Sequence, residues 1–302
     1  MVRTLSIVAA VLVMGVAAAA PPTTVLELNG WMLGQHQSAV SAYYPTPYQS
    51  HDGGPIRNDV HVLDRESKTY MIFSIDESRP TNYLLMMQLT GGATPAQKHA
   101  FIGLRLGDPV ARVRAVLGEP DATRASDLPG VTMWDYTQRN YTVEIDADGR
   151  LYSIRLEYWT GLPTAPPKEE IGAPPLKPFT DAIRTRDVDA LVALLMPDVE
   201  VYLDGEPQQV AGPFRDQLAD PSSPVAAALF GKDLSVARAL ANAAGAPEVN
   251  LRLWEDAGVG WVVKYPPPKS GPRIAELVWK YYPGGWRIWE IFVASTPMPA
   301  KP

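Results

Sequence analysis

Alternation of apolar and polar residues predicts strands in the first half of the chain. Three consecutive segments with this pattern lie at residues 131–136, 140–146 and 151–159, and a turn at 147–149 separates the last two. In the last segment, apolar residues such as Ile154 alternate with polar ones, as in a strand with one buried and one solvent-facing side. The pattern predicts an antiparallel meander.

A segment with helical spacing precedes this meander. Its apolar residues fall on one helical face and are Val110, Val113, Val116 and Leu117. Asp108 stands where an N-cap is expected, Pro109 occupies the first helical position, and Gly118 ends the pattern. The sequence therefore predicts a helix packed on one face of an antiparallel sheet, which is an α+β arrangement.

The same pattern occurs twice. At an offset of 73 residues the chain repeats Gly30 at Gly103, Leu33 at Leu106, Gly34 at Gly107, Val40 at Val113, Ala42 at Ala115 and Pro47 at Pro120. The match resumes at an offset of 70, where Ile75-Asp76 and Thr90-Gly91 align with Ile145-Asp146 and Thr160-Gly161. The offset changes within the polar stretch 49–67, which we interpret as a loop. We predict a duplicated unit with repeats at 30–91 and 103–161.

One strand differs between the two repeats. At the offset of 70, polar positions of the second repeat are replaced in the first by Tyr83, Leu85, Met87 and Leu89. The neighbouring strand changes likewise, with Ile72 and Ser74 in place of Thr142 and Glu144. An apolar outer face must be covered. Either another part of the chain covers it, or these four residues are candidates for binding a partner.

A proline-rich segment at 162–178 is typical of a semi-rigid linker and marks a domain boundary. Beyond it the pattern predicts helices first and strands afterwards. Helices are expected at 179–184, 188–195 and 235–244, a strand at 199–203, and two hairpins with turns at 256–258 and 283–285. Asp187 is placed to cap the second of these helices. We predict a second α+β domain over residues 179–296.

The last predicted hairpin offers no pair of catalytic groups. A three-residue turn would place Tyr282 opposite Trp286 and Val278 opposite Glu290, with Trp279 and Trp289 together on one nearly apolar face. Asp204, Trp279 and Trp289 are the candidate pocket residues. No pair of general acid and base converges on that face, so the pattern predicts no catalytic residue.

Two resemblances follow from these motifs. The pattern of Gly-x-x-Leu-Gly, a valine six residues later, a Gly-x-Pro and then an aromatic-rich meander resembles the tandem-repeat β-lactamase inhibitor proteins and the SmpA/OmlA-like outer-membrane assembly lipoproteins, over residues 29–161. This resemblance implies a binding module. Members of those families are disulfide-bonded or lipidated, whereas this chain has no cysteine.

Residues 176–294 resemble the NTF2-like cone fold in their order of helix and strand starts. This implies a curved antiparallel sheet around helices, often with a pocket. Many members, the steroid isomerases among them, are enzymes, and their catalytic aspartate would fall on Leu203 here. Asp204 lies one residue later and would face the opposite side of a strand.

The start of the chain carries an export pattern. Arg3 precedes an apolar run from Leu5 to about Val16, and alanines follow as far as residue 20. We interpret residues 1–20 as a cleavable signal peptide, with cleavage just before Pro21 and a mature protein in the periplasm or outside the cell. The alternative is an uncleaved anchor, but the apolar run is shorter than the roughly 20 residues that a membrane span needs.

The amino-acid composition excludes several kinds of site and ligand. The absence of cysteine excludes disulfides, thiolate metal sites and a lipid anchor on cysteine. A net charge of −6 without any block of Lys or Arg argues against nucleic-acid binding. No later segment is apolar enough to span a membrane.

One cluster of histidines and carboxylates contains residue types that can bind zinc. It comprises His51, Asp52, Asp59, His61 and Asp64. The spacing matches no metal motif, so we favour a solvated polar loop and predict no metal or other cofactor. The sequence thus predicts an exported, non-catalytic protein that binds an unidentified protein partner in the cell envelope. The alternative is an NTF2-like enzyme or small-molecule-binding protein that uses the pocket of the second domain.

Overall fold

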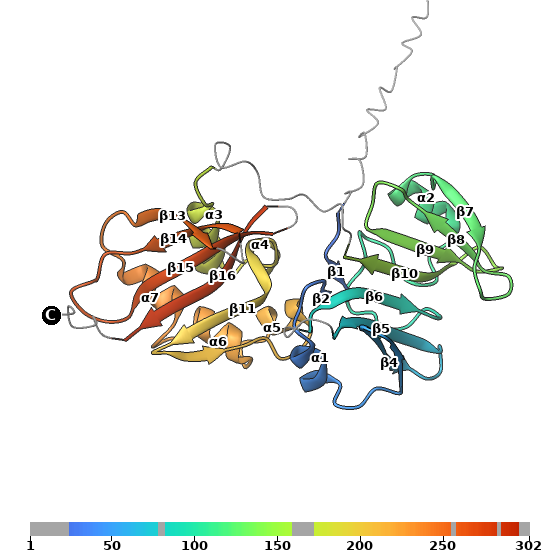
Figure 1. Ribbon diagram of the computed structural model, residues 1–302, viewed down its shortest axis with the longest axis horizontal. Coiled ribbons are helices and arrows are strands. Elements are labelled where there is room, and N and C mark those ends of the chain that lie inside the picture. Colours follow the sequence, from blue (N-terminus) through green and yellow to red (C-terminus); the bar gives the residue numbers. More distant parts are fainter. Residues whose placement is uncertain (1–23, 78–81, 159–171, 255–257, 283–284, 296–302) are drawn as a thin grey trace, which may run out of the picture.

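The protein is described by a computed structural model that covers residues 24–77, 82–158, 172–254, 258–282 and 285–295. It has a mixed α+β fold, as expected, with two main sheets (Figure 1). Residues 24–158, here called the first domain, hold one sheet, and residues 172–295, the second domain, hold the other. The predicted signal peptide and residues 162–171 of the predicted linker lie outside the described residues. None of the described helices is long and apolar enough to cross a membrane.

Within the described residues, the first domain contains an eight-stranded antiparallel sheet with the order β3-β4-β5-β6-β10-β9-β8-β7. Its strands are β3 (Gln49–Gly53), β4 (Ile56–Asp64), β5 (Thr69–Asp76), β6 (Leu84–Thr90), β7 (Ala122–Ala125), β8 (Thr132–Asp135), β9 (Tyr141–Ile145) and β10 (Leu151–Glu157). A separate small hairpin joins β1 (Glu27–Leu28) to β2 (Trp31–Met32). The predicted meander 131–159 is present, but β3, β4 and β7 were not predicted as strands.

The stretch 49–67 was wrongly interpreted as a loop. It contains the whole hairpin of β3 and β4, in which polar residues pair across the strands. The Ser50 hydroxyl donates to Asp59 Oδ1 at 2.7 Å, and Asp59 and His61 are both buried. Polar side chains satisfied by cross-strand partners allow a strand where hydrophobic alternation is missing.

The two halves of the first domain share several backbone features. Helix α1 (Gln37–Tyr43) precedes the first four strands, and α2 (Val110–Leu117) precedes the last four. Two glycines before each helix have left-handed backbones, with φ of +86° and +82° at Gly30 and Gly34 and of +83° and +84° at Gly103 and Gly107. Such angles favour glycine because it lacks a Cβ atom. Gly34 N–H donates to Leu84 O at 2.9 Å, and Gly107 N–H donates to Leu151 O at 2.7 Å.

The register of β6 corrects the expected outer apolar face. Met71 of β5 pairs with Leu89 of β6, and Tyr141 of β9 pairs with Leu156 of β10. Strands β5 and β9 therefore correspond at the expected offset of 70, but β6 and β10 correspond at an offset of 67. The connection that leads into β6 is three residues longer than its counterpart, and an odd shift reverses the faces of a strand. Met87 and Leu89 are therefore fully buried in the core of the domain.

The second domain contains a six-stranded sheet with the order β12-β11-β16-β15-β14-β13, in which β11 and β16 are parallel and the other pairs antiparallel. The strands are β11 (Leu195–Leu203), β12 (Glu206–Gln208), β13 (Glu248–Trp254), β14 (Gly258–Lys264), β15 (Arg273–Tyr282) and β16 (Gly285–Ala294). The helices are α3 (Leu176–Thr185), α4 (Val188–Leu194), α5 (Phe214–Ala219), α6 (Pro224–Phe230) and α7 (Val236–Asn242).

Helix prediction in this domain was partly right. Helices α3, α4 and α7 fall where expected, although α3 begins inside the predicted linker. Asp187 caps α4 as predicted, because its side chain accepts a hydrogen bond from Ala190 N at 3.0 Å. Helices α5 and α6 were not predicted. Helix α5 has only six residues, and all seven residues of α6 are apolar, so α6 shows no alternation between an apolar and a polar face.

The last hairpin follows the predicted register only in part. Val278 lies opposite Glu290, as predicted, but Tyr282 lies opposite Gly285 rather than Trp286. A bulge between Val278 and Trp279 absorbs one residue of β16. Because a bulge changes which side chains share a face, Trp279 and Trp289 separate. Trp279 is fully buried beneath Phe179, with ring centroids 6.1 Å apart, whereas Trp289 lies outside that core.

Candidate binding site between the two domains

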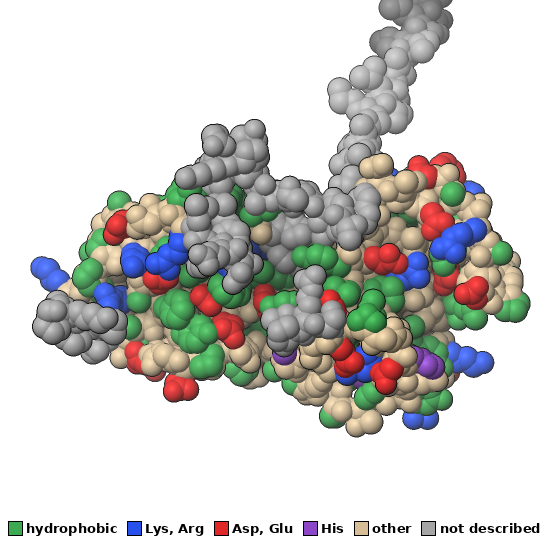
Figure 2. Space-filling view, in the orientation of Figure 1, with side chains coloured by type: hydrophobic (Ala, Val, Ile, Leu, Met, Phe, Trp, Pro, Cys, Tyr) green, Lys and Arg blue, Asp and Glu red, His purple; other side chains and the backbone are tan. Residues whose placement is uncertain are grey.

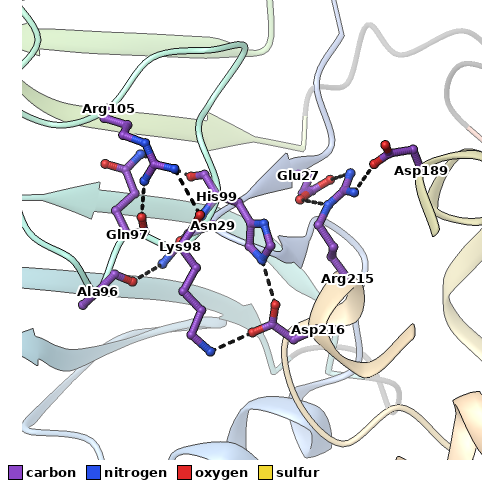
Figure 3. A network of polar contacts seen from close by, with 10 residues as sticks. All are labelled: Glu27, Asn29, Ala96, Gln97, Lys98, His99, Arg105, Asp189, Arg215 and Asp216. Carbon is purple, nitrogen blue, oxygen red and sulfur yellow. Dashed lines mark hydrogen bonds and ion pairs between the residues drawn. The ribbon is translucent and has the colours of Figure 1, made fainter. Parts of the chain in front are cut away.

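Ion pairs join the two domains close to α5 (Figure 3). Arg215 of α5 binds Glu27 of β1 through two hydrogen bonds, Nε to Oε1 at 2.7 Å and Nη2 to Oε2 at 2.8 Å. It also binds Asp189 of α4. Arg215 and Glu27 are each about one-fifth exposed, and a two-point pair of this kind fixes orientation as well as distance. The hydrogen bond to Glu27 raises the pKa of Arg215 above its ordinary value.

Asp216 provides a second connection. Its Oδ1 lies 2.7 Å from His99 Nε2, and its Oδ2 accepts a hydrogen bond from Lys98 Nζ at 3.0 Å. Burial by itself would raise the pKa of Asp216, but these two hydrogen bonds outweigh it and lower that pKa. The hydrogen bond to Asp216 in turn raises the pKa of Lys98. The hydrogen bonds from Lys98 and His99 therefore favour the ionised form of Asp216 at neutral pH.

Backbone contacts bring the domains still closer. Gln35 is fully buried and donates from Nε2 to the carbonyl of Gly212 at 2.9 Å. Arg215 N–H donates to Gly30 O at 3.1 Å. A Cβ atom at Gly30 would lie only 3.0 Å from the His99 ring and 3.3 Å from Pro213. The first glycine of the repeated motif thus permits a close approach between the domains.

A cavity of about 410 Å³ lies between the domains and is open to solvent. The first domain contributes residues at the start of α1 and just before β6. The second domain contributes residues of β11 and β16 and of the segment that follows β12. The lining residues are His36, Ser38, Ala39, Tyr83, Pro197, Asp198, Val199, Glu200, Gln209, Val210 and Trp289. Its volume falls within the range of sites for small ligands, which is roughly 300–1,000 Å³.

Asp198 is the most distinctive residue of this cavity. The Tyr83 hydroxyl donates a hydrogen bond to Asp198 Oδ2 at 3.1 Å, across the domain boundary. The other carboxyl oxygen, Oδ1, is buried and has no hydrogen-bond partner among the described residues. Burial raises the pKa of Asp198, and the hydrogen bond from Tyr83 and the charge of Lys280 only partly oppose this rise. An unpartnered buried oxygen is uncommon in folded proteins.

Further charges surround Asp198. Glu200 also lines the cavity, and it accepts hydrogen bonds from Gln209 Nε2 at 2.7 Å and from the Tyr202 hydroxyl. Burial raises the pKa of Glu290 and lowers the pKa of Lys280. The Lys280 ammonium lies 2.8 Å from the centroid of the Trp289 ring. Trp289 therefore both lines the cavity and contacts a cation of the sheet.

His36 forms the edge of the cavity on the first domain. It caps α1, where its Nδ1 accepts a hydrogen bond from Ser38 N at 3.1 Å. Its ring meets Tyr83 edge-on, with centroids 6.1 Å apart. A backbone bridge between His36 and Tyr83 fixes their spacing. These contacts hold two polar aromatic side chains against the second domain.

The structure separates the residues that the sequence grouped. Tyr83 and Trp289 line the cavity, although the sequence assigned them to different sites. Met87, Leu89 and Trp279 are core residues, and Leu85 is half-buried in β6. Asp204 is exposed in the turn after β11, where its Oδ1 accepts a hydrogen bond from Ser295 N at 2.7 Å.

Sequence reasoning missed Asp198, Glu200 and His36. The sequence held a usable signal for Asp198 and Glu200, because they alternate with the apolar residues Pro197, Val199 and Val201. Starting the strand at 195 rather than 199 would have placed Asp198 and Glu200 together on its polar face. Nothing in the sequence pairs them with Tyr83, which lies 115 residues away.

The histidine and carboxylate cluster of the first domain belongs to strands β3 and β4, not to a loop. Asp59 is occupied by Ser50 and Arg57, while His61 stacks on Tyr44 with ring centroids 4.8 Å apart. Burial lowers the pKa of His61. Over the described parts of the chain, no three His, Cys, Asp or Glu residues gather in a way that could hold a metal ion.

Comparisons with known proteins give little guidance. No family model matches the chain, and no curated protein matches it. A DUF4309 family protein (YjgB) from Bacillus subtilis subsp. subtilis str. 168 is 14% identical, with 40% of this chain and 77% of that chain covered and a TM-score of 0.29. An extracellular protein containing a SCP domain from Bacillus anthracis str. Ames is 12% identical, with 68% of each chain covered and a TM-score of 0.29. Scores this low carry no argument about fold or function.

Proposed function

We propose that this protein is an exported, non-catalytic binding protein of the cell envelope or surroundings that holds a group of its ligand in the cavity between the two domains. One observation carries the proposal: Asp198, whose buried oxygen Oδ1 has no hydrogen-bond partner among the described residues, lines a cavity to which both domains contribute. A buried acceptor without a donor costs roughly 1–3 kcal/mol. A ligand that supplies the donor removes this cost, so the site is better satisfied when occupied.

The proposal includes a duplicated first domain and an NTF2-like second domain. Support for the duplication comes from the matched glycine conformations and from two isolated bridges, His36–Tyr83 and Pro109–Arg150, at corresponding places. Support for the second assignment is the order of two helices, a strand, further helices and then hairpins. Export rests on the signal-peptide pattern of residues 1–20.

An enzyme remains the second candidate, because one observation favours it. Asp198 and Tyr83 are an ionisable pair in a cavity, and a carboxyl group with a raised pKa is a common general base. Such a pair was not expected from the sequence. We favour binding because the Tyr83 hydroxyl donates its hydrogen bond to Asp198 itself. Glu200 likewise already accepts hydrogen bonds from Gln209 and Tyr202.

The test is affinity capture with the cavity open or blocked. Gln209 is exposed at the cavity, so Gln209→Trp should block it without disturbing the core. Glu206→Trp, exposed on β12 and outside the cavity lining, is the matched control. Immobilised wild-type and variant proteins are exposed to a periplasmic extract and to culture medium, and bound molecules are identified by mass spectrometry.

We expect ligands that the wild type and Glu206→Trp retain and that Gln209→Trp loses. Equal capture by all three proteins would show that the cavity is not the binding site. Chemical conversion of the captured ligand by the wild type, but not by Asp198→Asn, would instead identify an enzyme. Unchanged ligand after prolonged incubation supports the binding function.

A further inference from the structure

We propose that the cavity between the domains recognises a primary ammonium group carried on an apolar stem. The inference rests on the proposed function and specifies its ligand. It starts from the acceptors: Asp198 and Glu200 are the carboxylates that line the cavity, and none of the described lining residues is Lys or Arg. An ionised carboxylate only accepts hydrogen bonds, so its natural complement is a charged donor.

Behind the cavity wall, Glu290 adds a third carboxylate to Asp198 and Glu200. Glu290 of β16 lies opposite Glu200 of β11 in the sheet, and the charges of Glu200 and Asp198 help to raise the pKa of Glu290. Lys280 is the cation that acts on Asp198 from the same sheet, and it rests on Trp289. From the first domain, His36 and Tyr83 face Asp198, and Tyr83 already donates to Oδ2. Three carboxylates with one ammonium leave an excess of negative charge, which favours a cationic ligand.

The vacant acceptor sets the position of the ammonium group. Asp198 Oδ1 is buried and lacks a donor among the described residues, while Oδ2 is bonded to Tyr83. A ligand that brings a donor to the Asp198 carboxylate would therefore supply the partner that the described residues do not. Removed from water, a charge-assisted hydrogen bond is about twice as strong as a neutral one. A positive charge would also favour the ionised form of Asp198, which burial disfavours.

The rest of the lining suits an apolar stem. Ala39, Pro197, Val199 and Val210 contribute aliphatic surface, and Tyr83 and Trp289 contribute aromatic rings. Aromatic rings attract ammonium groups as well as apolar chains. Lys280 shows that the Trp289 ring accepts a primary ammonium, because its Nζ lies 2.8 Å from the ring centroid. The same combination of acceptor, ring and aliphatic wall fits a free alkylamine or the side chain of a lysine in a protein partner.

The test is calorimetric titration of the full-length mature protein with hexylammonium, and with 1-hexanol and hexanoate as neutral and anionic counterparts of equal length. N-acetyl-lysine-methylamide is the fourth probe and represents a lysine in a peptide. Asp198→Asn removes the negative charge, keeps one acceptor oxygen for Tyr83 and replaces the other oxygen with an amide donor. Asp204→Asn, which alters an exposed aspartate outside the cavity, is the matched control.

We expect the wild type to bind hexylammonium at least tenfold more tightly than hexanol, and not to bind hexanoate. Asp198→Asn should weaken hexylammonium binding at least tenfold, Gln209→Trp should abolish it, and Asp204→Asn should leave it unchanged. Tighter binding of the lysine probe than of hexylammonium would assign the group to a protein partner, and the reverse would assign it to a free amine. Circular dichroism of Asp198→Asn verifies that the variant is folded.

Failure of this inference is distinct from failure of the proposed function. If hexanol or hexanoate binds as well as hexylammonium and Gln209→Trp blocks it, the cavity binds ligands but the ammonium assignment is wrong. If hexylammonium and the lysine probe do not bind at all, the ammonium assignment is also wrong, while the capture experiment with Gln209→Trp still decides the binding function. Equal binding of hexylammonium by the wild type and Asp198→Asn would show that the Asp198 carboxylate does not bind the ammonium group.

Discussion

The two halves of the first domain place different side chains on corresponding backbone positions. His36 bridges to Tyr83 before β6, and Pro109 bridges to Arg150 before β10. Tyr83 contacts Asp198 of the second domain, whereas Arg150 is exposed and donates to Gly107 O within its own half. The backbone bridge is thus the same in both halves, but only the side chain of Tyr83 contacts the second domain. On the face shown in Figure 2, acidic and basic side chains are scattered over both domains without a large area of one sign.

The largest expected effect tests the inward face of the central strands. Met87 of β6 and Ile154 of β10 correspond in register, and both are fully buried. Met87→Asp and Ile154→Asp should each lower the free energy of unfolding by about 3–5 kcal/mol, because a charge is buried without a partner. Urea denaturation measures this. Leu85→Asp, at a half-buried position, should cost less than half as much, and an equal cost would refute the register described for β6.

The second prediction concerns the link between the domains. Arg215→Ala removes the two hydrogen bonds to Glu27 and the contact with Asp189. Hydrogen bonds to charged groups contribute about 1.5–3 kcal/mol, so we expect a loss of this size in urea denaturation. The cavity should also lose affinity for its ligand, because both domains line it. Arg184→Ala removes an exposed ion pair with Asp181 and should change stability by less than about 1 kcal/mol.

The third prediction compares corresponding glycines. Gly30→Ala and Gly103→Ala both place a Cβ atom on a left-handed backbone, which costs about 1–2 kcal/mol. At Gly30 the new atom also meets His99 and Pro213 of the domain interface, whereas at Gly103 nothing lies within 4 Å. Thermal unfolding should show a larger loss for Gly30→Ala. Equal losses would mean that the domains do not approach each other at Gly30.

The smallest effect is a pH dependence at Asp198. Burial raises the pKa of Asp198 in the folded protein above its ordinary value, so the folded state binds this proton more tightly than the unfolded state. The stabilising contribution is full below the ordinary pKa and is lost as pH rises through the raised pKa. Relative to the wild type, Asp198→Asn should therefore become progressively more stable as pH rises from about 4 to 8. Thermal melts across this range measure the difference, and a constant difference would contradict the raised pKa.

Features that depend on neighbouring residues could be predicted from the sequence. The strands 131–159, the helix faces and the cap at Asp187 follow from periodicity and from hydrogen bonds between residues three apart. The left-handed glycines of the repeated motif mark turns for the same local reason. These features give the α+β class and the division into two sheets.

Tertiary structure decided the site. The three-residue difference in the connection to β6 and the bulge at Trp279 reverse or separate faces, and neither leaves a mark in the periodicity of the strands. Helix α5, too short to predict, carries Arg215 to Glu27 across 188 residues of sequence. Asp198 and Tyr83 meet across 115 residues only because the domains dock in this way. The sequence determined which side chains were available, and the packing of one domain against the other determined which of them share a cavity.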